Sequence, residues 1–438
     1  MKKIAFHTLG CKVNQVETEG LIEDFTSRGY ELVDFNETAD IYVVNSCTVT
    51  HVSDRKSRAM LRRAVRHNPA ALVVATGCVA QVNAEQLAAI EGVDLVIGNR
   101  DKENLVAIIE DYLQREHNGT EIFVKPISQQ DKPRAILYSH KHQRTRAFVK
   151  IQDGCQSFCS FCIVPLARGP VRSKPPEIVL QEITQLVRLG YREIVLSGIH
   201  TGFYGTDLKD WNLSRLIATI LETIPGQYRI RLSSIEPLEI DEDLLVMLAT
   251  DRRLCRHLHI PLQSGSNNVL KAMGRRYDRE YYQELIKTTA DRIPGIAFSA
   301  DVMVGFPTEM ETDFQDSYDL IAGLPLSDLH VFKYSQRAGT RAAEMFPQVA
   351  EQEKNKRSEI LLELARKKKL AFIKQFIGKE FSLLVEEKSG KDKYTGLTDN
   401  YINVHFQSDH DLCGQFAQVQ IISADQQGVL GCLCIATA

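Results

Sequence analysis

Three cysteines within eight residues form the first stretch whose residue types could do chemistry. The segment "DGCQSFCSFCIVP" spans residues 153–165 and holds Cys155, Cys159 and Cys162. Zinc sites commonly use C-x-x-C pairs, and the C-x-x-x-C-x-x-C spacing differs from them. Iron–sulfur clusters are held by cysteine thiolates in such tight runs. Three ligands on a four-iron cluster leave one iron without a protein ligand, so the loop predicts a cluster with an open coordination site.

A zinc site completed by a histidine is the alternative for this loop. The next cysteine along the chain is Cys255, too far in sequence to belong to the same run. A fourth ligand would therefore be His140, His142 or His200. Their separation from the loop in sequence makes the zinc site the weaker alternative.

A second set of three cysteines follows β-rich runs near the N-terminus. Cys11, Cys47 and Cys78 end the segments "IAFHTLGC", "IYVVNSC" and "LVVATGC". In an open parallel sheet the carboxyl ends of the strands lie along one edge, where ligands bind. We therefore expect these cysteines to meet at one edge of one sheet as ligands. The alternative is three unrelated buried cysteines, since cysteine packs as a small hydrophobe.

The elements around both sets predict an α/β protein with three domains. Within residues 1–113, β-rich runs alternate with helical runs at 14–28, 52–67, 84–91 and 102–113, which predicts an open parallel sheet covered on both faces. Residues 114–140 are polar with two prolines and are expected to be a linker, with an extended piece at "EIFVK".

The centre of the chain repeats the β/α alternation about six times. We expect residues 141–371 to form a partial (β/α)6 barrel, since a closed barrel of this kind has eight units. The stretch 351–374 is expected to be one helix. Residues 374–438 contain short alternating runs between turns and predict a small antiparallel β-barrel.

Composition narrows the classes of function. The chain has 438 residues, 44% hydrophobic and 25% charged, with a formal net charge of −3, so any nucleic-acid surface must be a local patch. No stretch has the apolar length of a membrane span, and "MKKIAFHTLGC" lacks the apolar core of a signal peptide. We expect a cytoplasmic protein whose ten cysteines stay reduced. Packing residues are expected at Cys255, Cys413, Cys432 and Cys434.

The loop "CQSFCSFC" after the first strand of a partial β/α barrel resembles the radical S-adenosylmethionine (SAM) superfamily. The resemblance implies that Cys155, Cys159 and Cys162 bind a 4Fe–4S cluster whose open iron chelates SAM. Electron transfer would then cleave SAM to a 5′-deoxyadenosyl radical. By the same resemblance, Phe161 packs near the adenine, Gly198 lets the backbone approach the methionine amino group, and Glu236 takes a ribose hydroxyl. A turn glycine and a surface carboxylate are the alternatives for the last two.

The whole chain resembles the methylthiotransferases within that superfamily. The matching stretches are "GCKVNQVETE", "NSCTVT", "ATGC", "ARGPVRS", "LSGIHTGFYG", "LSSIEP", "HIPLQSGSNNVLKAMGRRY" and "DVMVGFPTE". This resemblance implies a second 4Fe–4S cluster on Cys11, Cys47 and Cys78 that delivers sulfur, with two SAM molecules used per turnover. Apart from the cofactor ligands, it assigns no catalytic residue. Flavodoxin or ferredoxin is implied as electron donor, and the sulfur source stays unknown.

Family members act on modified adenosines beside the tRNA anticodon or on an aspartate of a ribosomal protein. The "GCKVN" and "NSCTVT" forms resemble the branch that acts on carbon 2 of N6-threonylcarbamoyladenosine, whereas the isopentenyladenosine branch usually has glutamine at the position of Lys12. A lysine can pair with the threonyl carboxylate. The alternative is that Lys12 offsets the charge of the thiolate cluster. A zinc-stabilised RNA-binding protein without catalysis is the remaining alternative.

Basic stretches predict contacts with tRNA phosphates. Residues 54–67 hold six Arg or Lys and one acidic residue, and residues 141–174 hold seven basic residues against Asp153. Arg58, Arg62, Arg168 and Arg172 are the candidates for these contacts. A solvated helix face is the alternative for residues 54–67. The C-terminal domain resembles the TRAM RNA-binding module, although residues 375–438 carry eight acidic and four basic residues. Stacking by Tyr394, Tyr401 and Phe406 could replace charge there.

Overall fold

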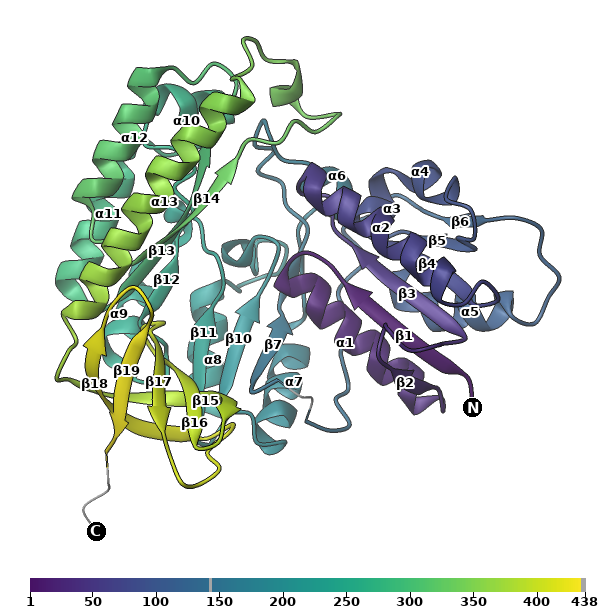
Figure 1. Cartoon of the computed structure of the whole chain (residues 1–438), viewed down its shortest axis with the longest axis horizontal. Coiled ribbons are helices and arrows are strands. Elements are labelled where there is room, and N and C mark those ends of the chain that lie inside the picture. The colour runs from purple at the N-terminus through teal and green to yellow at the C-terminus, as the bar shows by residue number, and fades with distance from the viewer. Residues whose placement is uncertain (142–143, 435–438) are drawn as a thin grey trace.

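A six-stranded parallel sheet forms the N-terminal part of the protein (Figure 1). The computed structural model describes residues 1–141 and 144–434. The strand order is β2-β1-β3-β4-β5-β6, and every neighbouring pair is parallel. The strands are β1 (Lys3–Thr8), β2 (Glu31–Val33), β3 (Ile41–Ser46), β4 (Leu72–Gly77), β5 (Leu95–Ile97) and β6 (Glu121–Phe123).

Helices cover both faces of this sheet, as apolar runs buried on both sides require. All six residues of β3 and all six of β4 are buried. The helices are α1 (Lys12–Ser27), α2 (His51–His67), α3 (Cys78–Val82), α4 (Ala84–Ala88) and α5 (Leu105–Tyr112), with a 3-10 turn at Asp101–Asn104 before α5. The expected parallel α/β sheet is confirmed.

The sheet extends further along the chain than residue 113. Strand β6 pairs with β5 in parallel, from Leu95 opposite Glu121 to Ile97 opposite Phe123. The extended piece expected in the linker is therefore the edge strand of the sheet, and only the residues after it connect the domains. Strand β2 (Glu31–Val33) was not expected from the sequence.

The central domain is an open arc of parallel strands. One sheet has the order β11-β10-β7 and a second the order β12-β13-β14. Backbone hydrogen bonds join the two, from Cys255 to Ile230 (2.8 Å) and from Ile235 to His259 (3.0 Å). The strands are β7 (Arg146–Lys150), β10 (Glu193–Ser197), β11 (Arg229–Leu232), β12 (His257–His259), β13 (Ala297–Val304) and β14 (Asp328–Lys333). The partial six-unit barrel is confirmed.

Helices line the outer side of this arc (Figure 1). They are α7 (Pro176–Arg188), α8 (Leu213–Thr223), α9 (Glu242–Thr250), α10 (Asn267–Met273), α11 (Arg279–Arg292), α12 (Glu311–Gly323) and α13 (Glu351–Lys374). Three 3-10 turns occur at Thr201–Phe203, Pro237–Glu239 and Arg341–Glu344. The loop after β7 carries a small hairpin of β8 (Gln152–Asp153) and β9 (Arg172–Ser173), with α6 (Val164–Arg168) between them.

The C-terminal domain is a closed five-stranded barrel, as expected. Its order is β15-β16-β17-β19-β18. The strands are β15 (Glu380–Gly390), β16 (Lys393–Thr398), β17 (Asn403–Gln407), β18 (Phe416–Ala424) and β19 (Val429–Leu433). Residues 435–438 of the predicted module lie outside the described residues.

Buried arginines fix the barrel to the amino ends of the central strands. Arg229 donates to the carbonyl oxygen of Leu397 (2.8 Å), and Arg231 donates to that of Thr398 (2.9 Å). Both guanidinium groups also pair with Glu193, the first residue of β10. The barrel therefore closes the end of the arc opposite the cysteine loop. No helix among the described residues is long and apolar enough to cross a membrane.

Candidate functional site

The loop with Cys155, Cys159 and Cys162 leaves the carboxyl end of β7 and is held at its base by the β8–β9 hairpin. Gly154 has φ +74°, and a Cβ there would overlap the carbonyl oxygen of Pro170. Only glycine fits such a left-handed, closely approached position without strain. The glycine of "DGC" thus lets the chain turn into the loop directly before the first cysteine.

Two basic side chains contact the sulfur atoms of this loop. Nδ1 of His200 lies 3.4 Å from Sγ of Cys155, and the guanidinium of Arg275 donates to Sγ of Cys159 at 3.2 Å. His200 also contacts Glu239 through Nε2 at 2.5 Å. Burial alone lowers the pKa of His200, but its bonds to Cys155 and Glu239 raise that pKa to about 9. The surroundings of the loop are therefore built for negatively charged sulfur.

The thiols of the loop differ in their surroundings. Burial raises the pKa of Cys155, but the hydrogen bond and charge of His200 outweigh burial and lower it below its ordinary value. Burial raises the pKa of Cys162 to about 12, and the charges of Cys159 and Cys155 add to the rise. A positively charged metal cluster removes this penalty, because thiolates are its ligands.

Cys11, Cys47 and Cys78 come together at the carboxyl edge of the N-terminal sheet. Cys11 precedes α1, Cys47 follows β3, and Cys78 begins α3 directly after β4. Gly10 has φ +101°, and a Cβ there would lie only 2.8 Å from Sγ of Cys47. Burial, together with the charges of Cys78 and Cys11, raises the pKa of Cys47 to about 11. The edge thus gathers thiols that are 67 residues apart in sequence at their extremes, since 78 minus 11 is 67.

Polar donors also surround this second triad. Nε of Arg168 donates to Sγ of Cys78 at 3.3 Å, and Nδ2 of Asn99 lies 3.7 Å from the same sulfur. Asn99 also donates to the carbonyl oxygen of Ala167 at 2.8 Å. Because Ala167 and Arg168 end α6, the helix after Cys162, one short helix contacts both triads. Both sets of sulfur donors and their cationic neighbours fit iron–sulfur clusters.

A buried ion network holds the two domains in this arrangement. Glu17 of α1 pairs with Lys102 (2.6 Å), Lys150 (2.7 Å) and Arg168 (2.5 Å). Asp153, two residues before Cys155, pairs with Lys150 (2.6 Å) and Arg172 (3.1 Å). Such a network is costly to break, because an unpartnered charge would be left inside the protein.

A second contact between the domains lies beside Cys47. Nη2 of Arg337 donates to Oγ1 of Thr48 and to Oδ2 of Asp54, each at 2.6 Å. The side chain of Arg337 is buried. It ties the end of the central arc to the start of α2.

The residues expected to contact SAM lie near the cysteine loop. Phe161 is half-buried and packs edge-on against Phe306, with ring centroids 6.5 Å apart. A Cβ at Gly198 would lie 2.9 Å from Oε1 of Gln152, so the backbone there is closely approached. Glu236 forms an ion pair with Arg275, the residue that donates to Cys159. Their contacts with SAM stay predictions.

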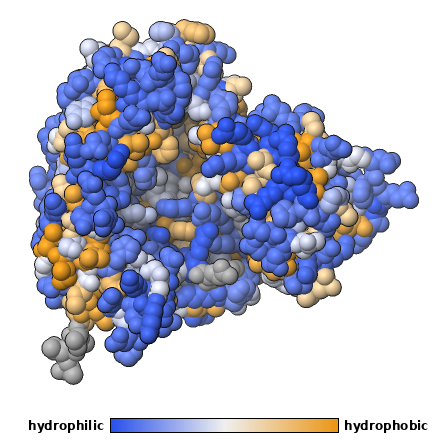
Figure 2. Space-filling model, viewed as in Figure 1, coloured by the Kyte–Doolittle hydropathy of each residue, from blue (hydrophilic) through white to orange (hydrophobic). Residues whose placement is uncertain are grey.

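The basic residues expected at tRNA phosphates divide into two groups. Arg62 is exposed and Arg58 is half-buried on α2, and Figure 2 shows a strongly hydrophilic strip over that helix. Arg168 and Arg172 are only 1% and 4% exposed and are paired inside the protein. The contacts with tRNA phosphates that we expected for Arg168 and Arg172 do not fit the burial of these side chains. The basic excess of residues 141–174 is balanced internally, because Glu17 pairs with Lys150 from the N-terminal domain and Glu182 of α7 pairs with Lys174.

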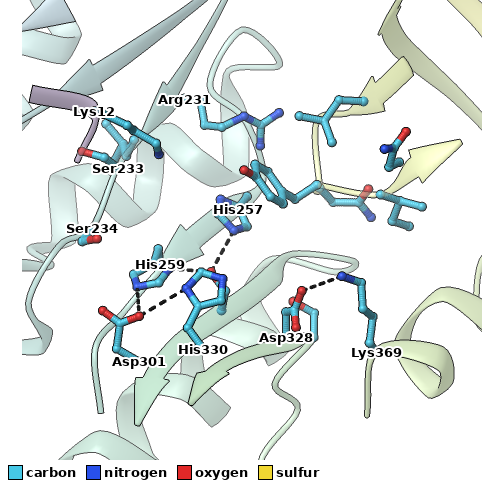
Figure 3. Close-up of a pocket in the computed structure, with 18 of the residues that line it drawn as sticks. Lys12, Arg231, Ser233, Ser234, His257, His259, Asp301, Asp328, His330 and Lys369 are labelled. Carbon is cyan, nitrogen blue, oxygen red and sulfur yellow. Dashed lines mark hydrogen bonds and ion pairs between the residues drawn. The ribbon is translucent and has the colours of Figure 1, made fainter. Parts of the chain in front are cut away.

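A central cavity of about 1290 Å³ lies between all three domains. It is visible as the hollow between the left and right lobes in Figure 2. Its lining comes from the N-terminal domain at Cys11 and Lys12, from the barrel at Tyr401, and from the inner face of the arc (Figure 3). It therefore joins the second triad to the inner face of the central arc.

Lys12 points into this cavity from the start of α1 (Figure 3). Burial lowers its pKa to about 8, and the neighbouring charges of Arg146 and Arg231 lower it as well. Among the described residues, Lys12 has no ion pair and no side-chain hydrogen bond within standard distances. The site thus presents an uncompensated cation to whatever fills the cavity.

Of the three histidines considered for a zinc site, His200 reaches the loop, through its contact with Cys155. His140 lies near Glu23 on the far side of the linker, with Nδ1 3.8 Å from that carboxylate, and His142 lies outside the described residues. Glu17 and Arg275 were not singled out from the sequence, Asp153 was noted only as the acidic residue of a basic stretch, and His200 was named only as a possible zinc ligand. The nearness of Glu17 and Asp153 to cysteine motifs was the available signal, whereas His200 and Arg275 are brought to the loop only by the fold.

Comparison with protein-family models identifies two regions. Residues 3–98 match the "Uncharacterized protein family UPF0004", and residues 149–321 match the "Radical SAM superfamily". The second match contains Cys155, Cys159 and Cys162. The cofactors of the central domain are therefore a 4Fe–4S cluster and SAM.

Relatives with curated names match nearly the full chain. The threonylcarbamoyladenosine tRNA methylthiotransferase MtaB of Bacillus subtilis is 42% identical over 97% of this chain and 94% of its own. The tRNA-2-methylthio-N(6)-dimethylallyladenosine synthase of Carboxydothermus hydrogenoformans is 34% identical over 94% of this chain and 95% of its own.

Among solved structures, the radical SAM methyltransferase TsrM from Kitasatospora setae superposes with a TM-score of 0.57 and 14% identity, over 76% of this chain and 73% of its own. At that identity the likeness shows the fold alone. The full-length sequence matches, together with the match to the radical SAM superfamily, show that the chain belongs to the radical SAM tRNA methylthiotransferase family.

Proposed function

We propose that this protein transfers a methylthio group to carbon 2 of N6-threonylcarbamoyladenosine next to the anticodon of tRNA. The observation that supports this substrate most directly is the position of Lys12, whose ammonium group lines the central cavity without a partner among the described residues. The Bacillus subtilis relative carries the same substrate in its name.

The threonylcarbamoyl group supplies a carboxylate that can pair with Lys12. A cation removed from water is unfavourable unless an anion pairs with it, and an ammonium–carboxylate hydrogen bond is among the stronger ones. Arg231 is already held by Glu193, 2.8 Å away, and by the carbonyl oxygens of Thr398 and Asp399, and Lys369 pairs with Asp328, 2.7 Å away. Lys12 is thus the lining cation that is free to bind a substrate carboxylate.

The isopentenyl substrate is the second candidate, because a relative at 34% identity is named for dimethylallyladenosine. An isopentenyl group is apolar and gains by contact with apolar side chains. Although Val13 and Val49 also line this side of the cavity, the charges that act most strongly on Lys12 come from Arg146 and Arg231, and Ser233 lies beside it. This lining favours the charged group.

We further propose that both cysteine triads carry 4Fe–4S clusters and that two SAM molecules are used per turnover. Clusters of this kind supply single electrons and an open iron position. The chain's own residues orient them: His200 and Arg275 contact the sulfurs of the loop, and Arg168 and Asn99 those of the N-terminal triad. Val49 and Val164, each two residues after a cysteine, line the cavity and limit water there. Flavodoxin or ferredoxin as electron donor and the cytoplasm as location belong to the same proposal.

The experiment compares substrates and variants in one assay. Anticodon stem-loops carrying threonylcarbamoyladenosine or isopentenyladenosine are offered together to the anaerobically reconstituted protein, and products are measured by nucleoside mass spectrometry. The wild-type protein is expected to methylthiolate the threonylcarbamoyl substrate. Lys12→Gln is expected to raise KM for that substrate at least tenfold, as loss of a charged hydrogen bond of about 1.5–3 kcal/mol requires.

Lys369→Gln is the matched control, since Lys369 is a lysine of the same cavity that already has a carboxylate partner. Its preference between the two stem-loops is expected to stay that of the wild-type protein. Equal modification of both stem-loops by the wild-type protein, or a methylthio mark on threonylcarbamoyladenosine that persists in a deletion strain, would overturn the substrate assignment.

A further inference from the structure

Two histidines and an aspartate meet on the inner face of the arc, where they line the central cavity (Figure 3). They are His259 of β12, Asp301 of β13 and His330 of β14, on three adjacent parallel strands. His259 lies opposite Ser299, two residues before Asp301, and Asp301 lies directly opposite His330. Because side chains two apart on a strand share one face, the register places all three on the cavity side.

Their ligand atoms have the spacing of a coordination shell. Nε2 of His259 lies 3.1 Å and Nδ1 of His330 lies 3.2 Å from the same oxygen, Oδ1 of Asp301. One ligand atom from each residue falls within 4.8 Å of the others. Ligands about 2.1 Å from a transition metal stand about 3 Å apart from their neighbours, so this group needs little rearrangement to close on an ion.

His259 faces Asp301 with Nε2, which is placed to serve as a metal ligand. Its Nε2 is buried and makes no hydrogen bond of acceptable geometry, although the carboxylate is near. Its other ring nitrogen, Nδ1, contacts Oγ of Ser299 at 2.9 Å, and that hydroxyl contacts Nε2 of His257 at 3.1 Å. Metal-bound histidines are usually fixed in this way through the second nitrogen, which leaves the first free for the metal.

The ring of His257 is itself held by the C-terminal barrel. It stacks on Tyr401 with centroids 4.3 Å apart and planes at 16°. The series of contacts from Tyr401 of the barrel through His257 and Ser299 thus holds the ring of His259 in place beside Asp301. A buried ring nitrogen that is held rigidly without a well-aligned hydrogen bond is unfavourable, because it has lost its hydrogen bond to water.

We propose that His259, Asp301 and His330 bind one divalent transition-metal ion, separate from the iron–sulfur clusters. Two histidines and one carboxylate select zinc or ferrous iron among the first-row metals and leave coordination positions open. All three residues lie beside the central cavity, so the open positions can take water or an oxygen atom of a substrate. The site holds no cysteine among the described residues and therefore belongs to neither triad.

Cobalt(II) binding to the reconstituted holoprotein tests the site. Oxidised 4Fe–4S clusters are EPR-silent, so high-spin cobalt(II) can be titrated by its own signal with the cysteine triads already occupied. One equivalent of cobalt with nitrogen and oxygen ligands is expected to bind the wild-type chain. His330→Gln and Asp301→Asn are each expected to weaken that binding 10–100-fold, since each removes one of three ligands.

His405→Gln is the matched control, because His405 is another exposed histidine of the same cavity. Cobalt affinity equal to that of the wild-type chain is expected for it. His330 is more than half exposed, so its variant keeps the test valid if Asp301→Asn fails to fold. Cobalt bound equally by the wild-type chain and His330→Gln, or no bound equivalent at millimolar cobalt, would overturn the proposal.

Discussion

Arg168 donates from Nε to the sulfur of Cys78 across 3.3 Å, although 90 residues separate them in the chain. The same side chain pairs with Glu17 and bonds to Asn14, both on the helix that follows Cys11. Because α6 begins two residues after Cys162, this one arginine couples the position of the cysteine loop to the N-terminal triad. The relative placement of the two triads thus depends on a residue that is 1% exposed.

Replacing Arg168 by methionine is expected to destabilise the protein by about 3–5 kcal/mol, because Glu17 and Asp153 lose a buried partner. Iron bound by the N-terminal triad is expected to fall more than iron bound by the loop, since the hydrogen bond to Cys78 is lost. Denaturant unfolding and iron analysis measure the two effects. Arg188→Met, at an exposed position on α7, is the control and is expected to leave both the stability and the amount of bound iron unchanged. Unchanged stability of Arg168→Met would contradict the structural role of the network.

Removing each triad separately is expected to abolish a different step of the reaction. The wild-type protein is expected to hold about eight irons per chain after anaerobic reconstitution, and either triple cysteine-to-alanine variant about half as many. The variant of Cys155, Cys159 and Cys162 is expected to lose SAM cleavage. The variant of Cys11, Cys47 and Cys78 is expected to keep the cleavage and to lose methylthio transfer. The proposed enzyme would be ruled out by a reconstituted chain that holds zinc and no iron.

Glu193→Gln is expected to loosen the C-terminal barrel and to lower stability by about 3 kcal/mol or more, because Arg229 and Arg231 lose their buried partner. Burial raises the pKa of Glu193, but Arg231 and Arg229 outweigh it and hold that pKa well below its ordinary range. The stabilisation is therefore complete above the ordinary glutamate pKa of about 4.3 and is lost as pH falls through the lowered pKa of the folded state. Denaturant unfolding at pH 6, 7 and 8 is expected to give the same difference in free energy of unfolding between the wild-type protein and Glu193→Gln at each pH. A difference that shrinks across this range would contradict the assignment.

Charge removal on α2 is expected to weaken tRNA binding in proportion to the number of phosphates that the helix neutralises. For Arg58→Gln with Arg62→Gln, the slope of log affinity against log salt is expected to fall by about 0.7–0.9 for each phosphate that is no longer neutralised. Binding measured between low and physiological salt gives the slope. Arg188→Gln, which removes a charge from the outer side of the central domain, is expected to leave the slope unchanged. Equal slopes for all variants would mean that α2 is a solvated face.

Local patterns in the sequence were sufficient to predict most of the secondary structure. The alternation of β-rich and helical runs predicts the parallel sheet and the six-unit arc, and the stretch 351–374 forms one helix with those bounds. The meeting of Cys11, Cys47 and Cys78 followed from their places at strand ends, because parallel strands end at one edge. Strand β2 was missed, whereas the equally short β6 was expected as an extended piece within the linker.

The sequence by itself determined the two cysteine triads, the domain types and the family, because ligand spacing and strand periodicity are local properties of the chain. Only the tertiary structure decided which charges face solvent. Lys150, Arg168 and Arg172 look like a phosphate-binding stretch in sequence, yet Glu17 and Asp153 neutralise them inside the protein. The same holds for His259, Asp301 and His330, which are 71 residues apart at their extremes, since 330 minus 259 is 71. Strand register brings them together, and register depends on the packing of the whole arc, not on the residues near each side chain.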